Sequence, residues 1–408
     1  MEKIVERFLK YVSFPTMSDE TTGTTPSTEK QKKLAAYLRD ELTALGLDDV
    51  RMDEHGYVYA TLPANTAEPT PAIGLISHMD TSDAASDTDI KPAIVDYHGG
   101  DILLNAEKNI CMTVADYPYL SDFAGKHLIV TDGTTLLGAD DKAGIAEIVT
   151  AVEELLHDGT AHGKVCIAFT PDEEIGEGTV CFDLEHFGAD YAYTVDGGFL
   201  GGIEYECFNG AAAKLHFHGV SIHPGSAKGK MKNAMLMAME LNALLPTDEI
   251  PACTEGYEGF FHLCDMEGDV ENATLSYIIR DHDREKFEKR KALMAACAEK
   301  INRKYGAGSV ELTMKDSYYN MKEIVDRFPY IVARAEDAMR TCGVKPFREP
   351  IRGGTDGAAL SYRGLPCPNL CTGGGNYHSR FEFIPVEDMI ACKDILKAIL
   401  RGAVGEKE

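Results

Sequence analysis

Acidic and histidine side chains gather at four places along this sequence. They are His78 and Asp80 after residues 72–77, Asp140 and Asp141 within residues 138–144, Glu173 and Glu174 after residues 164–170, and Asp196 after residues 191–195. If these segments belong to an open α/β sheet, the strand ends share one crevice, where such sheets bind ligands. So many carboxylates in one crevice would leave uncompensated negative charge, which a divalent cation would relieve. The residue types therefore indicate metal binding.

The candidate metal ligands are histidines and carboxylates, with no cysteine among them. They are His78, Asp140, Glu174, Asp196 and a late histidine, His378. Mixed histidine and carboxylate ligation with an open position fits catalytic zinc, and one shared carboxylate would allow two ions roughly 3.5–4 Å apart. Glu173 is then spare, and it can act as a general base on a metal-activated water. Asp80 lies two residues after His78 in extended chain, so it points the same way and would hold the imidazole.

Simpler structural roles compete with these assignments. A His-x-Asp pair also occurs where a histidine is hydrogen-bonded at the end of a strand, so His78 and Asp80 alone are a weak signal. Asp141 has the position of a helix cap. Two glycine-rich segments near the C-terminus match neither common nucleotide-binding motif. We expect their glycines to let the backbone approach the site closely, with Thr355 or Asp356 capping the following helix.

The segments that must position these residues have the pattern of an α/β fold. Leucines recur at helical spacing up to Gly46, which predicts a helix that ends there. Residues 72–77, 164–170 and 191–195 are continuous apolar runs, typical of parallel strands that are buried on both faces. Between the first two runs, apolar residues share one face of a predicted helix over residues 145–156.

The pattern changes from about Asn209. Segments 214–224 and 273–283 alternate apolar and polar residues, and helical stretches lie around residues 233–245 and 284–305. Alternating strands combined with two helices indicate an α+β module with a one-sided sheet.

The α/β pattern returns near the C-terminus, where residues 325–342 predict another helix before Gly343. The chain therefore has the organisation of one discontinuous domain interrupted by an insertion. We predict an α/β domain with a mixed, largely parallel sheet, formed by residues 1–208 and 319–408, and a smaller inserted α+β domain formed by residues 209–318.

Charge and composition exclude several classes of protein. The 408 residues include 66 acidic and 40 basic side chains, and the formal charge of −26 has the wrong sign for binding nucleic acid or an anionic membrane. The first twelve residues lack the apolar run of a signal peptide, and no later segment reaches about 18 uncharged apolar residues. Eleven cysteines are scattered without Cys-x-x-Cys pairs, as is typical of reduced thiols. We expect a cytoplasmic protein without nucleic-acid or membrane partners.

Eight motifs together resemble those of a known family. They are SHMDT, GADDKAG, TPDEEIG, TVDGG, SIHPGSAKGKMKNA, YIIRDHD, IRGGTDG and GGNYHS, in this order over nearly the whole chain. As a set they are similar to those of the di-zinc metallopeptidases, which include aminoacylases, carboxypeptidases, dipeptidases and tripeptide aminopeptidases. The resemblance implies that the α/β domain is a zinc-peptidase catalytic domain and that the insertion is a lid that binds substrate or dimerises.

The resemblance also implies roles for the metal-site residues. One Zn²⁺ would take His78 and Asp196, the other Glu174 and His378, and Asp140 would bridge the two ions. Asp80 would support His78, and Glu173 would be the base. The peptide bond between Asp140 and Asp141 is implied to be cis.

Four residues outside the metal site are assigned to the substrate by the same resemblance. His223 is similar to a histidine that stabilises the developing oxyanion, and Arg280 and Arg352 are similar to partners for a peptide carboxylate. Asn233 would add a polar contact. Each also has a simpler alternative: a turn before proline for His223, ordinary ion pairs for the arginines, and a helix cap for Asn233.

The resemblance implies a metal-dependent aminopeptidase that removes the N-terminal residue from tripeptides. A dipeptidase, carboxypeptidase or N-acyl amino acid amidohydrolase of the same fold is the alternative, because the same metal chemistry serves any amide. A metal-loaded protein that binds peptides without catalysis is disfavoured by Glu173, since binding needs no base. The expected partner is a small peptide, and the sequence leaves open whether the chain forms a homodimer.

Overall fold

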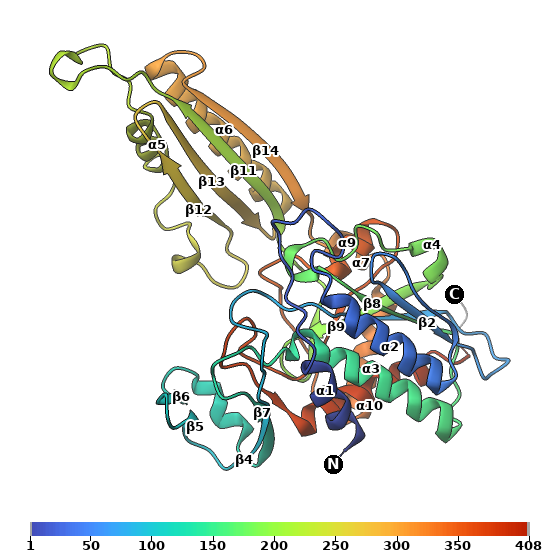
Figure 1. The fold of residues 1–408 in the computed structure, drawn as a ribbon. Helices are drawn as coiled ribbons and strands as arrows, with labels where there is room; N and C mark the ends of the chain where they lie inside the picture. The colour runs from blue at the N-terminus through green and yellow to red at the C-terminus, as the bar shows by residue number, and fades with distance from the viewer. Residues whose placement is uncertain (1, 406–408) are drawn as a thin grey trace. The chain divides into compact units, whose positions relative to one another are not determined.

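The computed structural model describes residues 2–405 and divides them into two compact units (Figure 1). The first unit contains the chain up to Tyr205, Glu323–Glu349 and the chain from Thr355 on. The second contains Glu206–Lys322 and Pro350–Gly354. None of the helices within residues 2–405 has the length and apolar character needed to cross a membrane.

An eight-stranded sheet forms the centre of the first unit. Its strands, in spatial order, are β1 (Asp48–Met52), β2 (Val58–Leu62), β8 (Val165–Thr170), β3 (Ile73–His78), β9 (Tyr191–Gly197), β16 (Asn369–Cys371), β10 (Gly202–Glu204) and β15 (Phe347–Arg348). The four central strands β8, β3, β9 and β16 are parallel, whereas β1, β2 and β10 pair antiparallel with their neighbours towards the centre. Every residue of β3 and β8 is buried. The predicted mixed α/β sheet is therefore confirmed.

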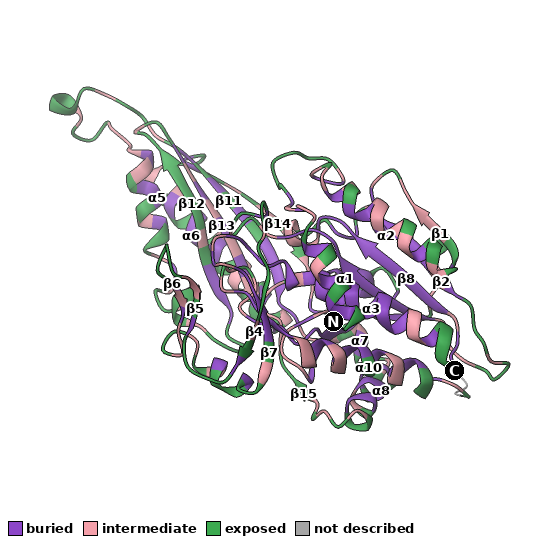
Figure 2. Ribbon diagram, turned by 60° about the horizontal axis from the view of Figure 1, so that its bottom comes forward, coloured by how far each residue is buried: buried purple, intermediate pink, exposed green. Residues whose placement is uncertain are grey.

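Helices cover both faces of this sheet. They are α1 (Lys3–Val12), α2 (Gln31–Leu45), α3 (Ala139–Asp158), α4 (Leu184–Phe187), α8 (Pro329–Thr341), α9 (Asp356–Tyr362) and α10 (Val386–Gly402), with α7 (Lys322–Val325) at the boundary of the unit. On one face α3 packs against β3 and β9, and it is largely buried because α1 and α10 pack on it in turn (Figure 2). On the other face, Phe187 of α4 and Leu360 of α9 join a cluster with Ile76 and Ala168.

One helix prediction is confirmed and another is correct except at its start. Helix α2 ends before Gly46, whose φ of 81° is a left-handed conformation that glycine adopts readily. The helix expected over residues 325–342 is α8, which ends before Gly343 as predicted but begins only at Pro329, and Val325 instead ends the separate short helix α7. A residue before proline avoids the helical region, and Phe328 accordingly has φ −128° and ψ 56°.

Residues 93–130 contain a small sheet that the sequence patterns did not reveal. Its central strand β7 (Lys126–Val130) pairs with β4 (Ala93–Tyr97) on one side and with β17 (Ile384–Pro385) on the other. A separate hairpin of β5 (Ile102–Asn105) and β6 (Ile110–Met112) lies between β4 and β7 in the chain. An aromatic core that includes Tyr97, Phe123 and Phe383 supports this sheet. Because β17 begins at Ile384, six positions after His378, the small sheet anchors the end of the loop that carries this histidine.

The second unit is an antiparallel sheet covered on one face by two helices. Its strands, in spatial order, are β12 (Phe260–Gly268), β13 (Asn272–Asp281), β11 (Asn209–His218) and β14 (Val310–Tyr318), and its helices are α5 (Ala234–Asn242) and α6 (Arg284–Tyr305). Phe217 of β11 packs with Met237 of α5 and Phe287 of α6 in a single core. The predicted α+β pattern with a one-sided sheet is confirmed.

The observed unit boundaries differ from the predicted ones at Asn209 and residue 318 by three or four residues, and a short later segment joins the second unit. Pro350–Gly354 belongs there because the Ile351 N–H donates to the Glu206 carbonyl at 2.8 Å, and the Phe208 N–H donates to the Gly353 carbonyl at 3.3 Å. Sequence periodicity does not report such a pairing between distant segments.

Candidate metal centre

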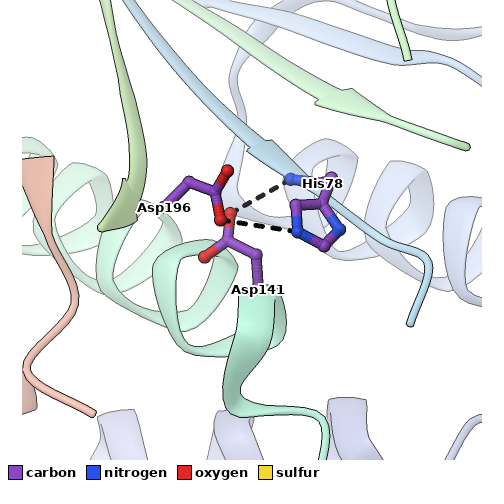
Figure 3. A group of neighbouring side chains, drawn as sticks. All are labelled: His78, Asp141 and Asp196. Atoms are coloured by element: carbon purple, nitrogen blue, oxygen red, sulfur yellow. Dashed lines mark hydrogen bonds and ion pairs between the residues drawn. The ribbon is translucent and has the colours of Figure 1, made fainter. Parts of the chain in front are cut away.

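Three of the candidate ligands face one another at the carboxyl ends of β3 and β9. His78 is the last residue of β3 and only 2% exposed. Its Nε2 lies 2.9 Å from Asp140 Oδ1 and 3.4 Å from Asp196 Oδ1. Figure 3 shows the Asp196 carboxylate turned towards the imidazole of His78. One nitrogen and two oxygen donors are thus directed at the same small volume.

A second group of donors shares Asp140 with the first. His378 Nε2 lies 2.8 Å from Glu174 Oε2 and 3.3 Å from Asp140 Oδ2. The two oxygens of Asp140 therefore face different histidines, Oδ1 towards His78 and Oδ2 towards His378. The other oxygen of Glu174 accepts the Ser82 N–H at 3.0 Å. All five residues that the sequence singled out as ligands lie in one cluster within the first unit.

Asp141 does not cap α3, which corrects the role expected from its position. It is fully buried, and its Oδ2 accepts the backbone N–H of His78 at 3.1 Å, the contact drawn in Figure 3. Gly138 is the N-cap residue of α3. The Asp141 carboxylate bonds to the end of β3 because the His78 N–H needs a hydrogen-bond acceptor at that buried position. The Asp140–Asp141 peptide bond is cis, as the family resemblance implied.

Asp80 links His78 to the loop that carries two glutamates. His78 Nδ1 lies 3.0 Å from the Asp80 carbonyl oxygen and 3.3 Å from Asp80 Oδ1. The Asp80 carboxylate accepts the Glu173 N–H at 3.0 Å and the Glu174 N–H at 3.2 Å. Asp80 is fully buried, so these contacts fix the His78 ring and the start of the loop together.

Burial and mutual repulsion shift the pKa values of these groups. Burial, reinforced by the Asp140 charge, raises the pKa of Glu174 to about 7. Burial also raises the pKa of Asp196 to about 6, against the favourable charge of His78. Burial would raise the pKa of Asp140 too, but hydrogen bonds from His378 and His78 outweigh it and hold that pKa below the usual range.

These shifts test whether the donor set fits a cation. Hydrogen bonds to Asp140 and Glu174 outweigh burial and raise the pKa of His378 to about 11, so that a protonated imidazole balances the carboxylates. A divalent cation would replace the imidazolium protons and relieve the repulsion among the carboxylates. The donors are imidazole and carboxylate alone, which suits zinc and related divalent ions. The residues present therefore fit a metal.

Glu173 lies half-buried beside this cluster. It is the first residue of a short 3-10 helix, Glu173–Ile175. The residue before it, Asp172, has a left-handed backbone conformation with φ 61°. Burial, with the negative charge of Asp196, raises the pKa of Glu173 well above its usual value. A carboxyl group with this environment holds a proton readily next to a candidate metal centre.

The four residues assigned to the substrate all lie in the second unit. His223 Nδ1 accepts the Gly225 N–H at 3.1 Å, and the Asn233 side chain accepts the Leu236 N–H at 3.2 Å at the start of α5. These contacts are the turn and helix cap expected as the simpler alternatives.

The two arginines among those four have backbone and aromatic partners. The Arg280 guanidinium donates to the Ala211 carbonyl at 3.3 Å and lies 5.0 Å from the centre of the Tyr318 ring. The Arg352 guanidinium donates to the Gly256 carbonyl at 2.7 Å and to Thr254 Oγ1 at 3.0 Å. The partners in these contacts are carbonyl oxygens, a hydroxyl and an aromatic ring. None of them is a carboxylate that would neutralise the charge of either arginine.

Two buried acids near the cluster were not found from the sequence. Asp356 was expected only as a cap of α9, but Thr355 caps that helix and Asp356 Oδ2 accepts the Thr170 hydroxyl at 2.8 Å. Glu382, only 2% exposed, accepts backbone N–H groups of the loop before Asp140. Its position between Phe381 and Phe383 could have indicated this role from the sequence, because an acid between two apolar residues is usually buried and then needs a hydrogen-bond partner.

Comparison with known proteins gives consistent matches over the whole chain. Residues 123–402 match the family described as Peptidase family M20/M25/M40. A protein named peptidase T from Halothermothrix orenii is 55% identical over 402 residues, which cover 98% of both chains. A protein of the same name from Caldanaerobacter subterraneus subsp. tengcongensis is 53% identical over 402 residues, again 98% of both chains.

Solved structures give the same result for the fold. The crystal structure of aminopeptidase PepT from Bacillus cereus is 25% identical, covers 98% of both chains and has a TM-score of 0.78. A tripeptidase from Staphylococcus aureus, 22% identical with the same coverage, has a TM-score of 0.79. A Bacillus subtilis protein described as a dinuclear metal binding peptidase has a TM-score of 0.65 at 13% identity, over 98% of this chain and 97% of its own.

Proposed function

The chain belongs to peptidase family M20/M25/M40, and from this membership we propose that it is a metal-dependent aminopeptidase that removes the N-terminal residue from tripeptides. The observation that carries the proposal is the 53–55% identity, over 98% of this chain, to proteins named peptidase T. The cluster of histidines and carboxylates in the first unit supports the metal dependence. The substrate is accordingly a small peptide.

We propose that the centre holds two zinc ions. His78 and Asp196 would bind one, Glu174 and His378 the other, and Asp140 would be shared between them. The proposal is supported by the two separate donor groups and by the opposite directions in which the Asp140 oxygens point. The bound ions would polarise the scissile carbonyl and acidify the attacking water.

The residues of the chain supply the proton transfers and the recognition of the peptide. Glu173 takes the proton of the attacking water and delivers it to the nitrogen of the leaving peptide as the C–N bond breaks. Its position directly before Glu174, at the edge of the donor cluster, supports this role, because the base must reach a water held by the ions. In the second unit, His223 would stabilise the oxyanion, while Asn233, Arg280 and Arg352 would hold the rest of the peptide and its carboxylate.

A cavity beside Glu174 is suited to the N-terminal residue of the substrate. It has a volume of about 510 Å³ and is lined by Met17–Thr21, Thr28, Lys30, Ser82, Asp83, Glu174 and Ile175. Lys30, the only basic residue of this lining, has its ammonium 2.8 Å from the Asp87 carboxylate. Asp19 and Asp83 therefore leave the wall negative, which favours the α-ammonium of a free peptide N-terminus.

We propose a cytoplasmic location, supported by eleven cysteines that are all free thiols.

One assay tests the proposed function. The protein is dialysed against a chelator, reloaded with Zn²⁺, Co²⁺ or Mn²⁺, and given di-, tri- and tetrapeptides with free or acetylated N-termini. We expect metal-dependent release of the N-terminal residue from free tripeptides, with slower cleavage of the shorter and longer peptides. Preference for dipeptides, for acetylated substrates or for release of the C-terminal residue would contradict the proposal and favour another member of the same fold.

A further inference from the structure

The carboxylate of Glu382 is surrounded by backbone donors from one short loop. Its Oε2 accepts the N–H groups of Leu137 at 2.9 Å and Gly138 at 2.7 Å, and its Oε1 accepts the N–H of Asp140 at 2.9 Å. The side chain is only 2% exposed. Three hydrogen bonds to one buried carboxyl group hold this loop more tightly than a single contact would, because the loss of any of them leaves a buried N–H without a partner.

Glu382 also closes the turn that carries His378. Its N–H donates to the Ser379 carbonyl at 3.1 Å, and the next residue, Phe383, exchanges two backbone hydrogen bonds of 2.9 and 3.0 Å with Gly375. The backbone of Glu382 therefore belongs to the His378 turn, and its side chain belongs to the Asp140 loop, 242 residues earlier in the chain. One residue fixes the distance between these two segments.

A buried lysine follows the same loop. Lys142 on α3 is fully buried, and its Nζ donates to the Phe14 carbonyl at 2.9 Å. This bond fixes the start of α3 two residues after Asp140, so the loop that Glu382 holds is anchored on its C-terminal side as well.

We propose that Glu382 is a positioning residue, which holds the backbone of Asp140 so that its two carboxylate oxygens face His78 and His378. The inference rests on the proposed metal centre. Asp140 is the ligand whose placement matters most, because a displacement that improves its contact with one ion worsens its contact with the other. Loss of a group that orients a metal ligand weakens metal affinity by roughly 10–100-fold.

The test compares Glu382→Gln with Asp388→Asn in the full-length protein. In Glu382→Gln an amide NH₂ replaces one carboxylate oxygen and cannot accept an N–H, so at least one of the three bonds is lost. Asp388 is a matched control, because it is 3% exposed, lies in the same C-terminal segment and bonds to Lys126 at 2.6 Å rather than to the Asp140 loop. Both metal-free variants are titrated with Zn²⁺ against a competing chelator, and the melting temperature of each metal-free protein is recorded.

We expect Zn²⁺ affinity to fall roughly 10–100-fold in Glu382→Gln and to stay at the wild-type value in Asp388→Asn. This difference should hold even if both substitutions lower the melting temperature of the metal-free protein. Wild-type affinity in Glu382→Gln, or an equal loss in both variants, overturns the positioning role. If Glu382→Gln does not fold, Glu382→Asp retains the charge but withdraws the oxygens by one methylene, and wild-type affinity there overturns the role as well. A wild-type protein that binds no divalent metal contradicts the proposed metal centre itself.

Discussion

The two units hold their candidate functional residues in contrasting surroundings. In the first unit, His78 contacts Asp140, 62 positions later in the chain, and Glu174 accepts an N–H from Ser82, 92 positions earlier. In the second unit, the side chains of His223 and Asn233 accept N–H groups only two or three positions away. The arginines of the second unit do reach distant positions, 69 residues away for Arg280 and 96 for Arg352, but their partners are neutral carbonyl oxygens. The first unit thus joins charged side chains to one another, whereas the second unit holds its candidates by local turns and neutral backbone groups.

This difference determines what each region does without a substrate. A buried site assembled by long-range contacts leaves a polar group unsatisfied when one member is removed, so substitution there changes metal affinity or the chemical step itself. Residues whose partners are neutral backbone groups leave no buried charge unpaired when they are substituted, so they lose little until a peptide binds. Substitutions in the second unit should therefore change selectivity among peptides and leave metal binding unchanged.

The largest expected effect is on the chemical step in the first unit. Glu173→Gln should keep its metal but lose about 10²–10⁴-fold in kcat, because general acid–base catalysis is worth that much. The exposed Glu177 of the same loop provides the control Glu177→Gln. Turnover is measured together with metal content by elemental analysis, and near-normal turnover by fully metallated Glu173→Gln would exclude this residue as the base.

The second unit is tested through its arginines. Arg280→Ala or Arg352→Ala should lower kcat/KM for free-carboxylate tripeptides by roughly 10–150-fold, because a charge-assisted contact contributes about 1.5–3 kcal/mol. The C-terminal amides of the same peptides should lose less, and zinc affinity should not change. Arg284→Ala is the control from the same unit. If neither variant reduces the difference in kcat/KM between the free-carboxylate peptides and their amides, these arginines do not recognise the carboxylate.

Asp80 tests whether the long-range contacts of the first unit act on the metal. Asp80→Asn should weaken zinc affinity or activity by roughly 10–100-fold, because it disturbs the orientation of His78 and the loop of Glu173. Asp87→Asn removes another buried carboxylate of the same segment, one that bonds to Lys30 at 2.8 Å rather than to His78, and should leave zinc affinity unchanged. Equal zinc affinity in the two variants, measured by competition titration, would show that Asp80 has no special role.

Acid should weaken zinc binding to the first unit. A cation must displace the imidazolium protons of His78 and His378 over the whole range from pH 7 to 5, because neighbouring carboxylates raise both pKa values, that of His378 to about 11. Glu174, with a pKa of about 7, and Asp196, with a pKa of about 6, hold further protons at low pH. Affinity should therefore fall as the pH is lowered from 7 to 5, by roughly tenfold per pH unit for each proton displaced. Titrations at pH 5, 6 and 7 measure this slope, and a pH-independent affinity would contradict the assignment of these ligands.

The smallest expected effect concerns the cavity beside Glu174. Asp83 is exposed, so its attraction for a peptide ammonium should be worth only ~0.2–1 kcal/mol, which is a few-fold increase in KM for Asp83→Asn. Acetylated peptides should show no such increase. Asp89→Asn removes an exposed carboxylate that does not line the cavity. An equal change in KM for free and acetylated peptides would remove Asp83 from the recognition of the N-terminus.

Sequence patterns predicted the parts of this protein that local chemistry determines. Continuous apolar runs revealed β3, β8 and β9, and polar residues at their ends revealed the metal-site cluster. The small sheet over residues 93–130 was missed because its strands are short and partly exposed. The roles of Asp141 and Glu382 were missed because their partners are backbone N–H groups of distant segments, and any residue type supplies such a group.

The most direct test of the assembled centre is anomalous X-ray scattering at the zinc edge from crystals of the zinc-loaded protein. We predict two peaks in the first unit, one in contact with His78 and Asp196 and the other with Glu174 and His378, and both in contact with Asp140. A single peak, or a pair of peaks that does not share Asp140, would contradict the account.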